Sequence, residues 1–397
     1  MKIAVLGGAG KVSLGAIQDF VEHESITKVL LADMNMEALK KRESFLNSDK
    51  VLIQQIDLNN HDELVRTLDG YDACLNGSSH HFNLKVMQAC IESRTHYTDF
   101  GGLFHWARKQ LDMHDEFQQA GITGIVGSGS APGIVNVMAR YAYDQLDQVR
   151  SVKIRDGIVN FNLDDTSFTP PYAIETLLDE FIMNSYEFKE GQFIELEPFS
   201  GAEEIDFPAP IGRQTVIHTI HSEVATMPIY FKDKGIQEVS FKLSLPRVFE
   251  EKLKFLVKIG MGSDQPVEVK GQQVIPRQVL AAVLKKTEDQ ALMTQSDVPF
   301  KHDDHKALRV EVQGEKAGQS CSYIMDCVIS PYAKWPHMSQ GVFSVGFPAA
   351  VTTRMLASGQ IKEKGFFASE AVIDPQIYFA ELAKRDIRVF ANFIQQI

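Results

Sequence analysis

Short apolar runs alternate with amphipathic helical patterns through the first 126 residues, and this alternation restricts the fold more than any other feature of the chain. Strands are predicted over 2–6, 28–32, 51–55, 73–76, 96–98 and 123–126. Helices are predicted between them over 15–22, 36–46, 62–68, 84–93 and 107–120. The pattern indicates an α/β domain in which helices cover both faces of a parallel sheet.

The pattern changes near Asp147. Longer alternating runs over 151–158, 215–221, 238–245 and 307–314 predict a mixed or antiparallel sheet, with one helix at 171–184 between them. The segment 342–359 is helical again, and a helix followed by a strand is expected in the tail, which we expect to return to the first domain. With 397 residues the chain is long enough for two domains. We place them at 1–127, completed by about 341–397, and at 128–340.

Composition excludes several classes of protein. The net charge of -12 argues against a nucleic-acid partner. No apolar run is long enough to span a membrane, and a strand that starts at Lys2 leaves no room for a signal peptide. Four cysteines in so long a chain do not resemble a disulfide framework. We therefore expect a cytoplasmic protein.

The turn after the first strand carries a G-x-G-x-x-S motif formed by Gly8, Gly10 and Ser13. In dinucleotide-binding folds the first glycine makes the tight turn and the second lets the main chain approach a pyrophosphate. The third position lets the helix pack closely on the strand. The pyrophosphate would lie near Lys11 and Val12, at the start of the next helix. The motif and its position predict a Rossmann domain.

Asp33 ends the second strand, KVLLAD, about twenty residues after the motif. A carboxylate there accepts hydrogen bonds from the ribose hydroxyls and repels a 2′-phosphate, which predicts NAD as cofactor, with NADP less favoured. The alternative is that Asp33 only caps the next helix. The basic residues at 40–42 lie too far along that helix for an easy 2′-phosphate contact. Asp57 either meets the adenine amino group or is a plain turn residue.

Three polar, glycine-rich loops follow the fourth, fifth and sixth strands: NGSSHHFN, TDFGG and GSGSAPGIVN. In an open parallel sheet, ligands bind beyond the carboxyl ends of the strands. We therefore add five residues to the cofactor site: Asn76, Gly77, Ser78, Gly101 and Gly102. The third loop opens a helix near Ile134, whose N–H groups could hold a carboxylate or the nicotinamide amide.

The segments VLGGAG, LLAD, YDACLNGSSHHFN, HYTDFGG and SAPGIVNVMARYA together resemble the saccharopine dehydrogenase family. The tail from GFPAAVTTRMLASGQ onward is also similar to the end of that family. The HHF and DFGG segments are most similar to its lysine 6-dehydrogenase branch. The middle of the chain, about 155–335, matches only in outline, and LSLPRVF stands where many members have an R-Y-P-G-like turn. This departure bears on the substrate more than on the reaction.

The resemblance implies an NAD(P)-dependent oxidation at a C–N bond of an amino acid, as in lysine 6-dehydrogenase or saccharopine dehydrogenase, with hydride transfer to nicotinamide through an imine. It also implies a small-molecule amino-acid substrate, and we expect a homodimer formed by the second domain. Two alternatives stay open. One is a dehydrogenase of the same family that acts on a carboxylated polyamine, and the other is an NAD-sensing protein without catalytic activity.

Amine oxidation needs a base that titrates near neutrality, because an ammonium group has no lone pair to expel hydride. The candidates for catalysis are Asp99, His80 and His218. Asp99 could instead cap a helix, and His80 could only line the cofactor cleft. His218 and His221 are three residues apart on a predicted strand and point to opposite faces. We expect His218 to face the cleft, and Glu223 to share the face of His221.

Substrate contacts are expected from residues at the strand ends and from arginines of the second domain. They are His81, Pro132, Gly133, Asn136, Arg155 and Arg213, with Arg247 as a further arginine that could bind a carboxylate. The segment KHDDHK at 301–306 is more typical of a solvated turn than of a metal site. Cys321 and Cys327 are expected to be core residues, so no metal is predicted.

Overall fold

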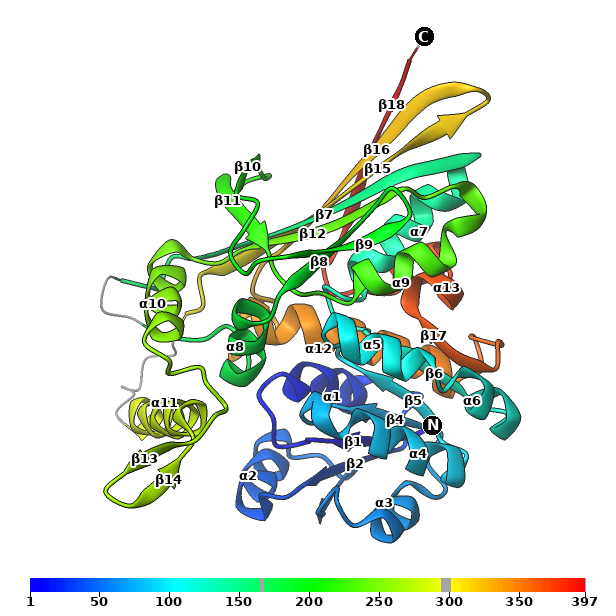
Figure 1. The fold of residues 1–397 in the computed structure, drawn as a ribbon. Helices are drawn as coiled ribbons and strands as arrows, with labels where there is room; N and C mark the ends of the chain where they lie inside the picture. The colour runs from blue at the N-terminus through cyan, green and yellow to red at the C-terminus, as the bar shows by residue number, and fades with distance from the viewer. Residues whose placement is uncertain (165–167, 294–300, 397) are drawn as a thin grey trace.

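The computed structural model describes residues 1–164, 168–293 and 301–396, and it contains two large sheets with helices between and around them (Figure 1). The first sheet lies in the blue and cyan part of the chain, apart from the orange β17, and the second lies in the green and yellow part, apart from the red β18. One buried apolar cluster contains residues of both sheets, for example Val5 and Leu308. The two domains therefore pack on a shared core.

The first sheet has seven parallel strands in the order β17-β6-β5-β4-β1-β2-β3. This confirms the predicted α/β class and the Rossmann arrangement. The strands are β1 (Lys2–Leu6), β2 (Lys28–Asp33), β3 (Val51–Gln55), β4 (Ala73–Asn76), β5 (His96–Asp99), β6 (Thr123–Val126) and β17 (Gly365–Ala368).

Six helices connect these strands: α1 (Ser13–Glu22), α2 (Met36–Leu46), α3 (His61–Leu68), α4 (Asn83–Ser93), α5 (Phe104–Leu111) and α6 (His114–Ala120). The prediction of one helix over 107–120 was wrong, because the chain turns at Asp112 and Met113 between α5 and α6. The turn brings α6 against β17, where the His114 ring nitrogen Nδ1 lies 2.9 Å from the Phe366 carbonyl oxygen. A contact between residues 252 positions apart thus ends the first helix.

The second sheet has the order β10-β11-β12-β7-β15-β16-β18, and in addition β8 pairs with β12 and β9 pairs with β8. Only the β12–β7 pair is parallel among the pairs of this sheet that the structure describes, which confirms a mixed sheet. Its strands are β7 (Gln148–Asn160), β8 (Ser185–Lys189), β9 (Gln192–Leu196), β10 (Glu203–Asp206), β11 (Arg213–His218), β12 (Glu238–Ser244), β15 (Asp304–Lys316), β16 (Gln319–Ile329) and β18 (Val389–Gln395). A separate hairpin is formed by β13 (Val267–Val269) and β14 (Gln272–Val274).

The remaining helices follow the sixth strand along the chain. They are α7 (Ile134–Gln145), α8 (Ile174–Ile182), α9 (Glu223–Tyr230), α10 (Arg247–Lys258), α11 (Pro276–Met293), α12 (Gln340–Ala357), α13 (Ser369–Val372) and α14 (Pro375–Ala383). Helix α12, orange in Figure 1, lies between the two sheets and contacts α1, β4, β5 and β15. It approaches α1 closely, since a Cβ on Gly346 would lie 2.7 Å from the Gly15 Cα atom.

The tail returns to the first domain only in part. Helix α12 and strand β17 do so, as expected. The last strand, β18, instead pairs with β16 at the edge of the second sheet. The expectation that the whole segment 341–397 completes the first domain is corrected for β18. The alternation of apolar residues predicts a strand but carries no information about which sheet accepts it.

Candidate active site

The glycine-rich turn forms a tight cradle at the start of α1. Gly7 has a φ of 68°, and a Cβ on it would lie 2.6 Å from the carbonyl group of Gly77. The Ser13 hydroxyl donates to the Gly7 carbonyl at 2.9 Å, so the third position of the motif fastens the turn. A Cβ on Gly10 would lie 3.0 Å from the same carbonyl oxygen. This compact turn at a helix start suits a dinucleotide pyrophosphate.

Asp33 and Arg42 both reach this turn. Asp33 accepts hydrogen bonds from the main-chain N–H groups of Ala9 at 3.2 Å and Asn35 at 3.0 Å. The Arg42 guanidinium donates to the carbonyl groups of Ala9 and Gly10 at 3.2 and 3.3 Å. Burial lowers the pKa of Arg42, and the nearby Asp33 carboxylate opposes this shift. The expectation that residues 40–42 lie too far away is therefore corrected for Arg42, whose long side chain spans the gap.

Asp57 and Asn76 have local partners. Asp57 is exposed and accepts from the main-chain and side-chain nitrogens of Asn59, as a turn residue does. Asn76 is buried and accepts from the main chain and hydroxyl of Ser78 at 3.2 and 2.6 Å. It thereby fixes the loop in which Gly77 and Ser78 line a large cavity.

Asp99 is fully engaged inside the protein. Its carboxylate accepts hydrogen bonds from Gln110 at 2.7 Å, Tyr97 at 2.8 Å and the main-chain N–H groups of Gly101 and Gly127 at 2.9 and 2.8 Å. Burial raises the pKa of Asp99, and these donors oppose the shift. Asp99 is not among the described residues that line the cavity. By accepting from Gly101 and Gly127, Asp99 holds the loops after β5 and β6 together. Its catalytic role stays a prediction.

In the segment Ala131–Pro132–Gly133 and the start of α7, some predicted site residues line the cavity and others do not. Pro132 lines the cavity, together with Gly101 and Gly102. Asn136 is buried outside the lining, where it accepts from the Gly133 N–H at 2.8 Å and donates to Glu370 at 2.8 Å. A Cβ on Gly133 would lie 2.0 Å from the Gly129 carbonyl oxygen, so the turn requires glycine. Gly133 and Asn136 therefore shape the loop rather than contact a ligand in this cavity.

The large cavity has a volume of about 580 Å³ and lies between the strand ends of the first sheet and the inner face of the second. Its floor consists of the glycine loops and of Val12, His80 and His81. Its opposite wall carries titratable groups from β7, α8, the β11–α9 connection, α11 and β15: Asp156, Tyr172, Glu175, Asp179, Glu180, His221, Arg277 and Lys306. None of these eight was among our predicted site residues.

Asp156 and Lys306 form a buried ion pair at 3.1 Å in this wall. The Lys306 ammonium also donates to the Ser130 hydroxyl at 3.2 Å, which joins the second sheet to the loop after β6. Burial raises the pKa of Asp156, and Lys306 opposes the shift. The sequence contains one indication that Asp156 faces the core. Asp156 alternates with Ile154 and Ile158, so it lies on the apolar face of the predicted strand.

His221 and Glu223 form a second pair. Their Nδ1 and Oε2 atoms lie 3.0 Å apart, and the His221 ring stacks on Phe241. The carboxylate only accepts, so Nδ1 carries a proton and Nε2 is the remaining nitrogen. Burial lowers the pKa of His221, but Glu223, Glu180 and Asp156 outweigh it, so that the pKa is raised above its ordinary value. This is the arrangement of an oriented general base.

Two further groups beside this pair have shifted pKa values. Burial raises the pKa of Glu180 to about 7, and the Tyr172 hydroxyl donates to its carboxylate. Burial lowers the pKa of His80 to about 4, and the neighbouring His81 adds to this shift. His80 lies 3.8 Å from Asp179, which is paired with Arg277 at 2.5 Å. His80 and His81 thus border the cavity, as predicted for the fourth strand end, although neither role is tested.

The structure places His218 and His221 opposite to our expectation. Strand β11 ends at His218, and the chain then turns toward α9, so residues 219–222 no longer follow strand alternation. His218 lines a depression of about 220 Å³ on the other face of the sheet, with Arg155. Burial lowers its pKa to about 4.

The predicted arginines also lie outside the large cavity. Arg155 pairs with Glu203 at 3.0 Å on the outer face of the second sheet. Arg213 is exposed and pairs with Asp206 at 2.7 Å, and Arg247 is exposed and pairs with Glu251 at 2.8 Å. The expectation that they contact a substrate in the cleft is corrected. For Arg155 and Arg213 the packing of the two domains decides which face of the sheet meets the cleft, and Arg247 begins helix α10 with its side chain in solvent.

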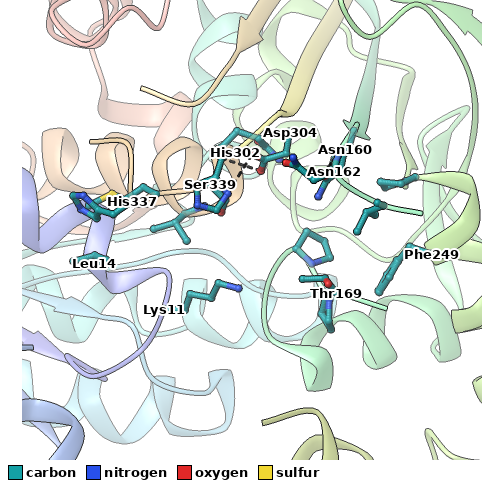
Figure 2. Close-up of a pocket in the computed structure, with 18 residues that line it drawn as sticks. Lys11, Leu14, Asn160, Asn162, Thr169, Phe249, His302, Asp304, His337 and Ser339 are labelled. Carbon is teal, nitrogen blue, oxygen red and sulfur yellow. Dashed lines mark hydrogen bonds and ion pairs between the residues drawn. The ribbon is translucent and has the colours of Figure 1, made fainter. Parts of the chain in front are cut away.

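The KHDDHK segment runs from a loop into the start of β15. Among the residues that the structure describes, no group of three or more His, Cys, Asp or Glu side chains could hold a metal ion. All four cysteines are buried and unpaired. His302 and Asp304 line a separate cavity (Figure 2). In the described parts of the chain, no helix is long and apolar enough to cross a membrane.

Comparison with known proteins agrees with this architecture. Residues 3–125 match the family described as saccharopine dehydrogenase NADP binding domain, and residues 129–387 match the saccharopine dehydrogenase C-terminal domain. The chain is 24% identical over 404 residues to carboxyaminopropylagmatine dehydrogenase of Synechocystis sp., which covers 97% of this chain and 96% of the relative. It is 25% identical to carboxynorspermidine synthase of Vibrio alginolyticus, over 86% of this chain and 83% of the relative.

Two solved structures share the fold over almost the whole chain. Saccharopine dehydrogenase (L-Glu forming) from Saccharomyces cerevisiae has a TM-score of 0.73 at 18% identity and covers 99% of each chain. Homospermidine synthase from Legionella pneumophila, solved in complex with NAD, has a TM-score of 0.70 at 12% identity, over 99% of this chain and 91% of the other. At these identities the likeness shows the fold alone.

Proposed function

This chain belongs to the saccharopine dehydrogenase family of oxidoreductases, and we propose that it makes or breaks a secondary-amine C–N bond in a carboxylated polyamine. The relatives named above act, by their names, on chains that combine several amino groups with a carboxyl group. This corresponds to the alternative that the sequence left open. Our first reading, an amino acid such as lysine or saccharopine, has less support.

The observation that carries the proposal is the acidic wall of the large cavity. Four carboxyl groups line it, Asp156, Glu175, Asp179 and Glu180. Asp156 and Asp179 are paired with Lys306 and Arg277, and Glu180, whose pKa burial raises to about 7, is ionised only in part near neutral pH. The excess of negative charge therefore comes from Glu175 and the ionised fraction of Glu180. In a partly buried site an excess of negative charge favours a ligand with several ammonium groups. Saccharopine, with three carboxylates, would be repelled by the same wall.

A nicotinamide dinucleotide, when bound at the glycine-rich turn, supplies or accepts the hydride in this chemistry. The residues that would hold it are the cradle of Gly8 and Gly10, Asp33, and the loop glycines Gly77 and Gly101. His221 Nε2 would take a proton from the substrate ammonium in the oxidative direction, since the free amine has the lone pair that oxidation requires. Glu223 holds the ring in the orientation that leaves Nε2 available.

For the coenzyme we propose NAD. Asp33 ends β2 beside the glycine-rich turn, where a carboxylate favours the ribose hydroxyls and opposes a 2′-phosphate. Arg42 partly offsets this charge. Its Nη2 atom is engaged by the carbonyl groups of Ala9 and Gly10, whereas its Nη1 atom has no hydrogen-bond partner among the described residues. Because the positive charge of Arg42 partly offsets that of Asp33, we expect a moderate preference for NAD, and NADP should still bind.

We also propose that the protein is a homodimer formed through the second sheet. Edge strand β18 exposes Phe390, Phe393 and Ile394, by 67%, 42% and 54%. An exposed apolar edge strand favours association with another strand or face. Light scattering after gel filtration should give twice the chain mass, and Phe390→Lys should lower that mass; a monomeric wild type would refute the proposal.

The test of the reaction is the absorbance of reduced nicotinamide with NAD or NADP at mildly alkaline pH. Carboxynorspermidine and carboxyaminopropylagmatine should be oxidised, and lysine and saccharopine should not. Turnover of lysine or saccharopine alone would restore the amino-acid reading. No turnover with any of the four, together with clear dinucleotide binding by calorimetry, would favour a sensing protein.

A further inference from the structure

A second cavity of about 360 Å³ lies beside the large one, and the proposed reaction does not use it (Figure 2). The two cavities share Ile158 as a lining residue. The polar groups of the second cavity come from β7 and its following loop, from the start of β15, from the glycine-rich turn and from the start of α12. They include Asn160, Asn162, His302, Asp304, Lys11 and Ser339.

The strand register makes the two cavities neighbours along one face of the second sheet. In β7 the residues Asp156, Ile158 and Asn160 alternate onto the inner face. In β15 Lys306 pairs with Ile158, and Asp304 pairs with Asn160. Alternate residues of a strand lie roughly 6.6 Å apart. One elongated molecule can therefore contact Lys306 in the first cavity and Asp304 in the second.

Asp304 has an unsatisfied acceptor in this cavity. The residue is 6% exposed, and its Oδ2 atom accepts from the Gln340 N–H at 2.9 Å. Its Oδ1 atom is buried and has no hydrogen-bond partner among the described residues. The His302 Nδ1 atom lies 3.9 Å from Oδ1, beyond hydrogen-bond distance. A buried acceptor without a donor is costly, so a ligand that brings a donor is favoured.

The other polar groups of the cavity suit an anion. His302 lines the same wall as Asp304, and Lys11 enters from the glycine-rich turn on the opposite side (Figure 2). The side-chain amide of Asn160 adds donors, whereas the Asn162 amide donates to the Lys301 carbonyl at 3.2 Å. One small cavity thus offers a carboxylate that lacks a donor together with basic and amide groups. This combination matches a group that carries an ammonium and a carboxylate close together.

We propose that the second cavity binds the carboxylated, α-amino-acid end of the substrate, with Asp304 Oδ1 accepting from its ammonium group and with His302 and Lys11 facing its carboxylate. The amine end then occupies the acidic large cavity. This inference rests on the proposed function, because it requires a substrate that carries both ends. It explains how one cleft selects a carboxylated polyamine over a plain one.

The test is Asp304→Asn, which keeps the size of the side chain and an acceptor for the Gln340 N–H but removes the charge. The matched control is Asp303→Asn. Asp303 is adjacent, pairs with His305 at 2.9 Å and is not among the described residues lining the cavity. We expect Asp304→Asn to raise the KM for the carboxylated polyamine by about 10- to 100-fold, with the KM for the dinucleotide unchanged. Asp303→Asn should leave both constants unchanged.

A binding measurement separates this inference from the proposed reaction. L-homoserine carries the amino-acid end without a second amine, and 1,3-diaminopropane carries the amines without a carboxylate. By calorimetry, Asp304→Asn should lose affinity for L-homoserine and keep its affinity for 1,3-diaminopropane. If the wild-type protein oxidises no carboxylated polyamine but binds L-homoserine through Asp304, the reaction is wrong and the subsite stands.

The subsite is overturned if the wild-type protein is active and Asp304→Asn binds L-homoserine and substrate as the wild type does. Asp304 also caps the start of α12, so its variant could fail to fold, which a thermal melt would reveal. In that case His302→Gln replaces it, because this side chain is 24% exposed and lines the same wall of the cavity as Asp304. It should weaken L-homoserine binding, and unchanged binding would likewise overturn the proposal.

Discussion

Replacing Glu223 by glutamine isolates the electrostatic part of the His221–Glu223 pair. The Glu223 side chain is fully buried, and glutamine preserves its size and an acceptor for His221 Nδ1. Burial lowers the pKa of His221, and the Glu223 carboxylate is the largest influence that raises it. Without that charge burial dominates. We expect the pKa of His221 to fall by roughly 1–3 units, the range for loss of an adjacent opposite charge.

The assay is the pH profile of kcat/KM for oxidation, from pH 5 to 10. His221 must be neutral to take a proton, so activity should rise with pH through its pKa in the free enzyme. In Glu223→Gln this rise should move to lower pH by the same 1–3 units. The plateau should fall by about 10²-fold, since the base is weaker and its ring less firmly oriented.

The same shift has a consequence for stability. Because the pKa of His221 is raised in the folded state, the stabilisation from its pair is fully present below the unfolded pKa of about 6.5. It is lost as pH rises through the folded pKa. Glu223→Gln should therefore lower the melting temperature more at pH 5.5 than at pH 9. Equal losses at the two pH values would contradict a charged pair.

Glu238→Gln is the matched control, because Glu238 is an exposed carboxylate at the start of β12, the strand that carries Phe241 beneath the His221 ring. Its pH profile should coincide with that of the wild type. A profile of Glu223→Gln that also coincides with the wild type would refute His221 as the base. His221→Asn should remove the rise altogether, and a rise that persists in that variant would assign the proton to another group of the wall.

Three further changes test other parts of the structure. In Gly77→Ala the new Cβ would lie 2.4 Å from the Ser13 hydroxyl. Dinucleotide binding, measured by NADH fluorescence, should therefore weaken about tenfold or more. Unchanged binding would place the dinucleotide elsewhere. Asp33→Ser removes the charge that opposes a 2′-phosphate. The ratio of kcat/KM for NADP to that for NAD should therefore rise about tenfold or more. A constant ratio would show that Asp33 does not determine the choice of coenzyme. Asp19→Ala removes from the buried Arg354 its partner at 3.0 Å and leaves Glu381 at 3.2 Å as the remaining carboxylate. Urea unfolding should therefore show a loss of about 1–3 kcal/mol, and no measurable loss would mean that the pair with Asp19 is effectively solvated.

Much of the first domain is readable from local pattern. Strands β1, β3, β4 and β6 and helix α2 have the predicted bounds, because apolar periodicity and the turn residues that end it are encoded within a few positions. The glycine motif and Asp33 identified the turn on which the cofactor proposal depends. Even there, the contact between α6 and β17 divided a helix that local pattern predicts as one.

In the second domain the sequence predicted strands but not which of their residues form the site. Asp156 and Lys306 are 150 positions apart, and only the antiparallel register of β7 and β15 brings them together. A polar residue at a core position was a usable signal for Asp156. Nothing local distinguishes His221 from His218, since the turn into α9 decides which ring enters the cavity.

The sequence by itself determined the α/β alternation, the glycine-rich turn with Asp33, and the family resemblance, because each depends on residues that are close in the chain. The tertiary structure decided which charged side chains face the cleft, where β18 pairs, and that Asp99 and Asn136 hold loops from within the core. These properties depend on strand register and on packing between segments hundreds of residues apart. Local periodicity specifies that a residue is buried, whereas only the assembled sheets specify what it is buried against.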